Sequence, residues 1–112
     1  MAHNPLADDL VELVARRFRA LADPTRIKLL DHLQVGEASV QELTAIVGSS
    51  QQNVSKHLGV LHQAGIVGRR RDGNHVLYSI ADHGVFALCE DVCGSLREQA
   101  ESLRRVVASV AG

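Results

Sequence analysis

The stretch from Ser49 to Val67, SSQQNVSKHLGVLHQAGIV, constrains the fold of this chain more than any other. It opens with two serines, whose hydroxyls can accept from a free backbone N–H at a helix start. Val54, Leu58 and Leu61 then recur at helical spacing and form one apolar stripe. Gly65 follows, a residue type that commonly ends helices. The sequence therefore predicts a helix with one buried face.

The face opposite this stripe is polar and partly basic. Its side chains are those of Gln51, Gln52, Ser55, Lys56 and His62. Amides can pair with adenine edges, while lysines and hydroxyls reach guanine or phosphate in a DNA major groove. An ordinary solvated helix face has a similar composition, so the surroundings of the helix must decide between the two interpretations.

A second short helix is predicted directly before this stretch. Ser39 and Glu42 stand at the spacing of a capping box, an apolar pattern runs from Val40 to Val47, and Gly48 ends it. Two short helices joined by a tight turn that contains glycine form a helix-turn-helix. The helix after the turn is then the candidate for reading DNA.

The apolar pattern after this helix changes to the alternation typical of strands. Residues 66–71 and 75–80 are predicted as two strands joined by the turn sequence Asp72-Gly73-Asn74. Three consecutive arginines near the tip are Arg69, Arg70 and Arg71. Alternation along a strand places the first and third on one side and the second on the other. A helix-turn-helix followed by a basic hairpin is a winged helix.

Two further helices are predicted before the helix-turn-helix. Residues 5–21 carry an apolar stripe at helical spacing, and proline is tolerated in the first turn of a helix. Asp23 caps the next helix, which begins at Pro24 and should end before Gly36. The side chains expected to face the core in this second helix are those of Ile27, Leu30 and Leu33.

The final helix is predicted over residues 82–109, with Asp82 as its cap. Its apolar side consists of Val85, Leu88, Cys89, Val92, Cys93, Leu96, Leu103, Val106 and Val110. A helix this long in a small domain cannot bury its whole stripe against its own core. Together with the stripe on residues 5–21, this predicts a two-fold homodimer built from long N- and C-terminal dimerisation helices.

Length and composition bound the class of protein. A chain of 112 residues forms one domain, here residues 1–112, and its 46% hydrophobic content excludes extensive disorder. No apolar run is long enough to span a membrane, and the first nine residues do not resemble a signal peptide. We therefore expect a cytoplasmic protein, with no membrane partner, whose two cysteines are reduced at rest.

Charge is unevenly distributed along the chain. Residues 50–78 carry four basic side chains against one acidic, whereas the whole chain has a net charge of −1. A basic patch on a mildly acidic body is typical of a protein that binds DNA through one surface.

Enzymes are the first alternative class, and a winged helix that binds only proteins is the second. The sequence has no phosphate loop, nucleophile elbow or metalloprotease helix motif, so no catalytic function is expected. Lys56 and the three arginines of the hairpin count against the second alternative. The predicted fold is α+β, mostly α: a winged helix-turn-helix that binds double-stranded DNA.

Three segments of the chain resemble the arsenic-repressor (ArsR/SmtB-type) family of winged-helix transcriptional repressors. Residues 18–26, FRALADPTR, are similar to that family's F-x-A-L-A-D-P-T-R start. Residues 50–67 are similar to its S-Q-x-x-V-S-x-H-L-x-x-L-x-x-A-G-L-V signature. Arg70 to Asn74, together with Tyr78, look like its wing. The resemblance covers roughly residues 14–98.

This resemblance implies a homodimer that covers a promoter at an inverted-repeat operator and leaves it when an effector binds. By position, the side chains that would face DNA are those of Ser50, Gln51, Gln52, Ser55, Lys56 and His57. Two roles are open for His57, because it can also lie on the inner edge of the helix as a structural residue.

The metal sites of the family are not reproduced here. The helix before the reader helix contains no cysteine, so the family's C-x-C thiol site is absent. The zinc-type site on the last helix uses D-x-H followed by H-x-x-E/H. Aligned on Asp82, the histidine position holds Gly84, and the later pair falls at Ser95 and Glu98. His83 is one residue out of place.

Cys89 and Cys93 are the remaining candidates for sensing an effector. Residues four apart on a helix share a face, so two thiolates could jointly bind a soft ion. The candidates are arsenite, cadmium, lead, mercury and Cu(I). Two alternatives stay open: a thiol-based redox or sulfide response, which needs an accessible thiolate, and buried cysteines that only pack, in a regulator with no cysteine sensor.

Overall fold

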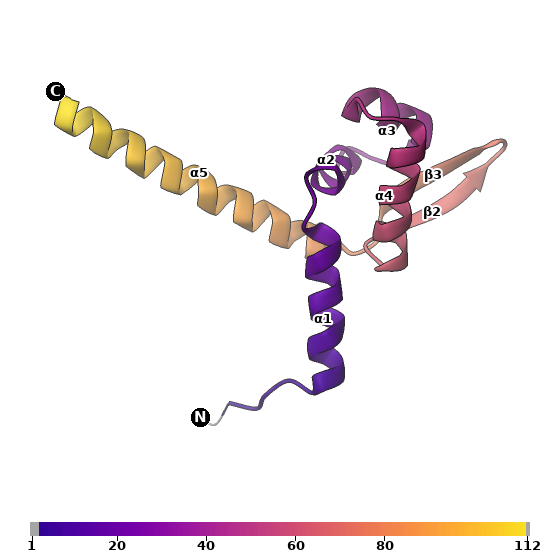
Figure 1. Cartoon of the computed structure of the whole chain (residues 1–112), viewed down its shortest axis with the longest axis horizontal. Coiled ribbons are helices and arrows are strands. Elements are labelled where there is room, and N and C mark those ends of the chain that lie inside the picture. Colours follow the sequence, from indigo (N-terminus) through magenta and orange to yellow (C-terminus); the bar gives the residue numbers. More distant parts are fainter. Residues whose placement is uncertain (1–2, 112) are drawn as a thin grey trace. The chain divides into compact units, whose positions relative to one another are not determined.

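The computed structural model describes residues 3–111 and is shown in Figure 1. In chain order, its elements are α1 (Asp8–Leu21), α2 (Pro24–Leu33), β1 (Ala38–Ser39), α3 (Val40–Val47), α4 (Gln51–Gln63), β2 (Val67–Asp72), β3 (His75–Ile80) and α5 (His83–Ala111). The chain divides into two units, one that ends at Asp82 and one that begins at His83 and consists of α5. The predicted α+β, mostly helical winged helix-turn-helix is confirmed.

The core of the first unit lies among α2, α3 and α4. Its fully buried side chains are Leu29 and Leu30 of α2, Leu43 of α3, Val54, Leu58 and Leu61 of α4, and Ile66. The predicted stripe of α4 is therefore the buried face of that helix. With few aromatic residues in the chain, aliphatic packing supplies most of the stabilisation from burial.

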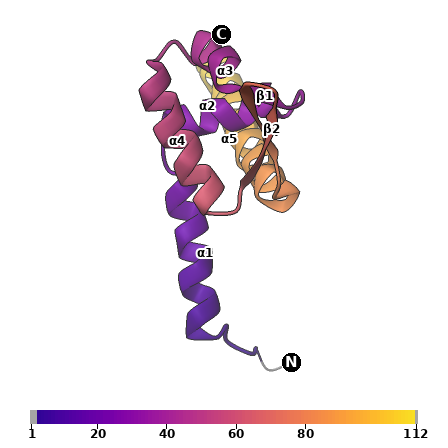
Figure 2. The same ribbon diagram turned by 90° about the vertical axis from the view of Figure 1, so that its right-hand side faces the viewer.

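The turn between α3 and α4 forms as predicted, and Figure 2 shows it joining the two helices. Ser39 accepts from the backbone N–H of Glu42, whose carboxylate in turn accepts from Ser39, completing the capping box. At the other end of α3, Gly48 adopts a φ of 73°, in the left-handed region that glycine enters without a steric penalty. The chain can thus turn sharply into α4.

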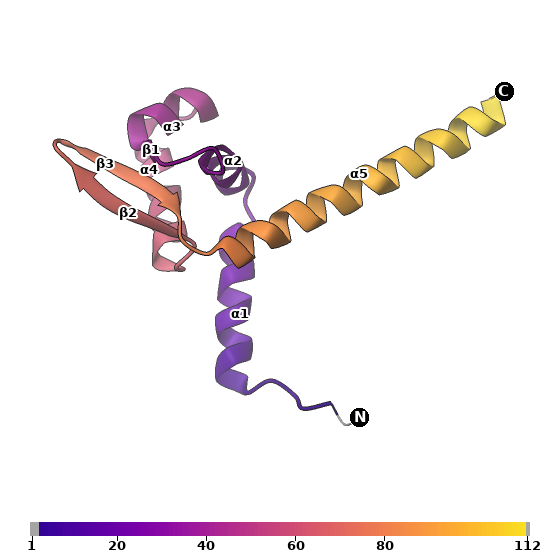
Figure 3. The same cartoon turned by 180° about the vertical axis from the view of Figure 1, so that it is seen from behind.

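The sheet within residues 3–111 has the strand order β1-β3-β2. β2 and β3 pair antiparallel around a two-residue loop, and their hairpin extends away from the helices (Figure 3). β1 was not predicted, because two residues with no strand preference give no periodic signal. Ala38 and Ser39 pair with Tyr78 and Leu77 of β3.

The base of the hairpin is closed by one carbonyl group. The Ile66 carbonyl accepts from the backbone N–H of Ala81 at 2.9 Å and from that of Asp82 at 3.1 Å. The Asp82 carboxylate also pairs with the guanidinium of Arg17 from α1. The residues that precede α5 are thereby fixed to the end of α4 and to α1.

Three details of the helices differ from the expectations. α1 begins at Asp8 rather than at Pro5, because the two acidic residues Asp8 and Asp9 favour its positive N-terminal end. In α2, Ile27 is 50% exposed, and Leu29 takes the expected core position. α5 runs from His83 to Ala111, slightly beyond the predicted end.

None of the helices within residues 3–111 combines the length and the apolar character needed to cross a membrane.

Two glycines offer a matched test of the turn before α4. A Cβ added at Gly48 or at Gly59 would meet no atom within 4 Å, so steric clashes do not distinguish the two sites. Gly48→Ala should lower the free energy of unfolding by about 1–2 kcal/mol, because its backbone is left-handed. Gly59→Ala, inside α4, should raise that free energy by about 0.5–1 kcal/mol.

Urea unfolding of both variants at one fixed protein concentration measures these changes. A shift of the same sign in both variants would contradict the left-handed turn.

Candidate nucleic-acid interface

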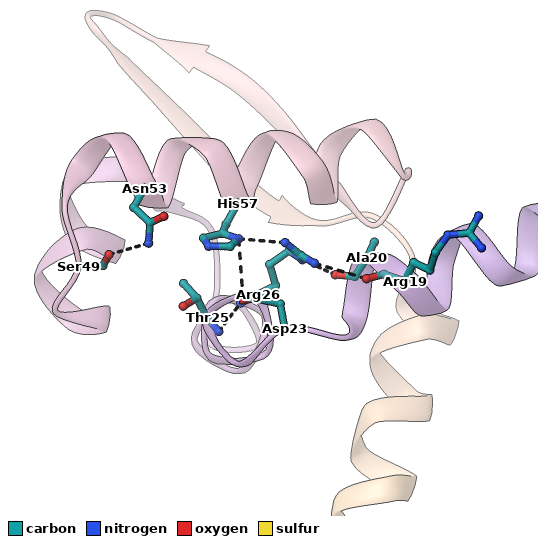
Figure 4. A network of polar contacts seen from close by, with 8 residues as sticks. All are labelled: Arg19, Ala20, Asp23, Thr25, Arg26, Ser49, Asn53 and His57. Carbon is teal, nitrogen blue, oxygen red and sulfur yellow. Dashed lines mark hydrogen bonds and ion pairs between the residues drawn. The ribbon is translucent and has the colours of Figure 1, made fainter.

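The N-terminal turn of α4 is fixed by the two serines that precede and cap it. Ser50 accepts from the backbone N–H of Asn53 at 3.1 Å, the N-cap bond expected from the sequence. The Asn53 side-chain amide donates to the Ser49 hydroxyl at 2.8 Å (Figure 4). Both bonds order the end of the helix that carries the candidate DNA-reading side chains.

Five of the predicted contact residues are exposed on this end of α4. They are Ser50, Gln51, Gln52, Ser55 and Lys56. The stripe of Val54, Leu58 and Leu61 on the opposite face is fully buried, so packing holds the polar face outward. Exposed amide, hydroxyl and ammonium groups beside free N-terminal N–H groups suit both base edges and phosphates.

The three arginines of β2 are all exposed, but they are not equivalent. Arg70 donates to the carboxylate of Glu37 through Nε at 2.9 Å and also through Nη2, a two-bond ion pair. This hydrogen bond holds the pKa of Glu37 below its usual range and raises the pKa of Arg70. Arg69 and Arg71 stand opposite Tyr78 and Val76 of β3, on the alternate side of the strand.

The imidazole of His57 is directed toward the interior rather than toward solvent. Its side chain is 14% exposed, and its Nδ1 lies 3.0 Å from Nη1 of Arg26 and 3.8 Å from Oδ1 of Asp23 (Figure 4). Of the two roles left open by the sequence, this position favours the structural one.

The partners of these side chains give no signal in the sequence. Sequence patterns assign no role to Glu37 and include Arg26 only within the FRALADPTR segment. Asp23 was expected to cap α2, and it does so by accepting from the backbone N–H groups of Thr25 and Arg26. The Arg26–His57 and Glu37–Arg70 pairs join residues 31 and 33 positions apart, a separation at which sequence spacing gives no signal.

The cysteines lie on α5, in the second unit. Cys89 is half-buried and Cys93 is exposed, and neither forms a disulfide. Burial raises the pKa of the Cys89 thiol. Across residues 3–111 of a single chain, no three His, Cys, Asp or Glu side chains come together as a metal site. Two thiols are therefore the most that one chain offers at this position.

The helix-turn-helix with its exposed basic face and basic hairpin defines a winged-helix DNA-binding protein. Comparisons with known proteins agree. The helix-turn-helix domain family matches residues 21–70. The HTH-type transcriptional regulator KmtR of Mycobacterium tuberculosis is 43% identical over 88 residues, which are 79% of this chain and 68% of KmtR.

Two solved structures resemble the chain over most of its length. The homodimeric winged helix-turn-helix DNA-binding domain of a possible ArsR-family regulator from Mycobacterium bovis has a TM-score of 0.76 and 32% identity, covering 88% of this chain and 92% of that one. The antimony-specific transcriptional repressor AntR has a TM-score of 0.77 and 32% identity, covering 91% and 92%.

The chain belongs to the ArsR/SmtB-type family of winged-helix transcriptional regulators. It is accordingly a DNA-binding regulator and not an enzyme.

Lys56 and Gln51 should affect DNA binding in different ways. Lys56→Ala should weaken binding to all sequences and reduce the slope of log affinity against log salt by about 1 for each chain, because a phosphate contact is lost. Gln51→Ala should instead relax base preference, because its amide can read a base edge. Fluorescence anisotropy over a range of salt concentrations measures both effects, and an unchanged slope in Lys56→Ala would contradict this docking of α4.

Arg71 and Arg70 form a matched pair in the wing, since each replacement by alanine removes one positive charge. Arg71→Ala should weaken DNA binding more than Arg70→Ala, because the Arg70 charge is already compensated by Glu37. Glu37→Gln should strengthen binding by freeing Arg70 and removing a negative charge.

Titration of one DNA duplex with the three variants measures this order. Equal losses in Arg70→Ala and Arg71→Ala would contradict it.

Proposed function

We propose that this chain is a transcriptional repressor that binds an inverted-repeat operator as a homodimer and is released by an effector. The observation that carries this proposal is the two-sided character of α4. Its apolar stripe is completely buried, while its amide, hydroxyl and lysine side chains are exposed at the N-terminal end. The side chains assigned to DNA are Ser50, Gln51, Gln52, Ser55 and Lys56, together with Arg69 and Arg71 of the wing.

Exposed apolar side chains on the terminal helices support the homodimer. Leu13 and Phe18 of α1 are 55% and 52% exposed, and Leu96 and Val106 of α5 are each 59% exposed. Such stripes in a single chain favour a partner that covers them. A second copy is the natural partner, and the related domain from Mycobacterium bovis is homodimeric. Two reader helices would then lie about one DNA turn apart, roughly 34 Å.

Cys89 and Cys93 are the residues we assign to the effector. They lie four apart on α5, within one turn of each other, and neither is fully buried. Thiolates prefer soft ions, which fits arsenite, cadmium, lead or mercury, whereas a zinc site needs four ligands, more than the two thiols of one chain. The related AntR is antimony-specific, which is also consistent with a soft metalloid. Pairing of two α5 helices in the dimer would supply further thiols.

A soft ion is favoured over an oxidant by the environment of Cys89. Its burial raises the pKa of the thiol, which leaves less of the thiolate that reacts with oxidants or persulfides. A metal ion competes with the proton for sulfur and can deprotonate the thiol on binding. Two alternatives remain as outcomes of the test. One is a regulator that responds to redox change or to sulfide, and the other is a regulator with no cysteine sensor.

The test uses fluorescence anisotropy on DNA from the region upstream of the gene. Arsenite, Cd²⁺, Pb²⁺ and Hg²⁺ are added to the wild type and to a Cys89→Ser, Cys93→Ser double variant. We expect a thiophilic ion to weaken wild-type binding about 5- to 150-fold, the usual range for coupled sites. The double variant should bind the same DNA without responding to the ion, and sedimentation should show that both proteins are dimers.

Other outcomes separate the parts of the proposal. Release by an oxidant or by sulfide, but by no ion, would favour the redox alternative. Full induction of the double variant would show that the cysteines only pack. A monomer at micromolar concentration, or no binding to any duplex, would contradict the proposal that the chain is a dimeric DNA-binding repressor.

A further inference from the structure

Arg26 lies at the point where α1, α2 and α4 meet, and its guanidinium contacts groups from two other helices (Figure 4). Its Nε donates to the Ala20 carbonyl at 2.6 Å, and its Nη2 donates to the Arg19 carbonyl at 3.4 Å. Its Nη1 lies 3.0 Å from Nδ1 of His57 on α4. A single side chain thus joins the end of one helix to the middle of another.

The local sequence explains why α1 needs this contact. Carbonyl groups in the last turn of a helix have no intrahelical partner. The Ala20 carbonyl would ordinarily accept from the N–H four residues later, but that residue is Pro24, which has no N–H. The Arg26 guanidinium supplies the missing donor. Arg26 is itself held in place by Asp23, which accepts from its backbone N–H and thereby lowers the pKa of the Asp23 carboxyl.

The bond to α4 defines which ring nitrogen of His57 accepts. A guanidinium carries five N–H donors and no acceptor, so Nδ1 of His57 must accept and cannot carry a proton. This hydrogen bond leaves Nε2 as the ring nitrogen that carries the proton. Oδ1 of Asp23, at 3.8 Å from the same nitrogen, is too far to form a hydrogen bond with it. Arg26 is the group that orients the ring.

This bond acts on the rotation of α4 about its axis. The stripe of Val54, Leu58 and Leu61 holds the helix down, but apolar contacts are not directional. His57 follows Lys56 directly, between the buried stripe and the exposed DNA-reading face. A directional bond at this position fixes where the reading side chains point, so a small rotation of α4 would displace them from base edges.

We propose that Arg26 is a positioning residue of the DNA interface, which sets the orientation of α4 through His57 while capping the C-terminal end of α1. The inference rests on the proposed docking of α4 in DNA and goes beyond it. It removes His57 from the DNA contacts. It also makes Arg26 a determinant of DNA sequence specificity, although Arg26 contacts no base. Because α1 is one of the proposed dimerisation helices, the contact between Arg26 and His57 also connects a dimerisation helix to α4, the proposed DNA-reading helix.

A double-mutant cycle tests this coupling. Arg26→Gln, His57→Leu and the double variant are compared with the wild type for binding to operator DNA and to an unrelated duplex of the same length. We expect each single variant to lower the ratio of the two affinities about fivefold or more. The double variant should lose no more than the larger single loss, because the bond broken in His57→Leu is already broken in Arg26→Gln.

Two matched variants control for charge and for bulk. Arg16→Gln removes a positive charge from the same cleft between α1 and α4 without touching His57, and it should leave the ratio unchanged. His57→Gln keeps an acceptor for Arg26 and should recover most of the ratio lost in His57→Leu. Melting temperature and sedimentation show whether each variant remains a folded dimer.

A measurement on the wild type keeps the inference testable if a variant does not fold. Nitrogen NMR of the imidazole should show the proton of His57 on Nε2 in the free protein. A proton on Nδ1 would overturn the inference, as would additive losses in the double variant or an equal loss in Arg16→Gln. Binding of no duplex by the wild type would instead reject the DNA docking on which the inference rests.

Discussion

The packing of one face of α4 against the leucines of α2 and α3 is the interaction on which the rest of this protein depends. Val54, Leu58 and Leu61 are completely excluded from solvent, and the opposite face of the helix is thereby held outward. This burial stabilises the fold without specifying an orientation, since apolar contacts tolerate small rotations. Precision must come from directional groups, and α4 has them at Ser50 in its N-cap and at His57 along its length.

The distribution of charge along this chain, rather than its net charge, is what suits it to bind DNA. The net charge is slightly negative, yet the exposed end of α4 and the wing are basic. Within the wing, Glu37 compensates Arg70, so the strand presents two uncompensated guanidinium groups on one side.

Local signals in the sequence predicted most of the fold. The Ser39–Glu42 capping box, the turn at Gly48, the Ser50 cap and the hairpin around Gly73 all form as expected. The features that the sequence does not predict depend on tertiary contacts instead. β1 forms because it pairs with β3. Ile27 is exposed because tertiary packing buries Leu29 of α2 instead. Pairs such as Arg26 with His57 depend on helices meeting in space, which neither periodicity nor composition records.

The carbonyl of Ile66 closes the base of the wing independently of its tip. Because both ends of the hairpin are tied there, residues could be added or removed around Gly73 without moving α4 or Asp82. The wing is therefore free to change length during evolution. A lineage could acquire a different reach along DNA while keeping the helices that fold the protein.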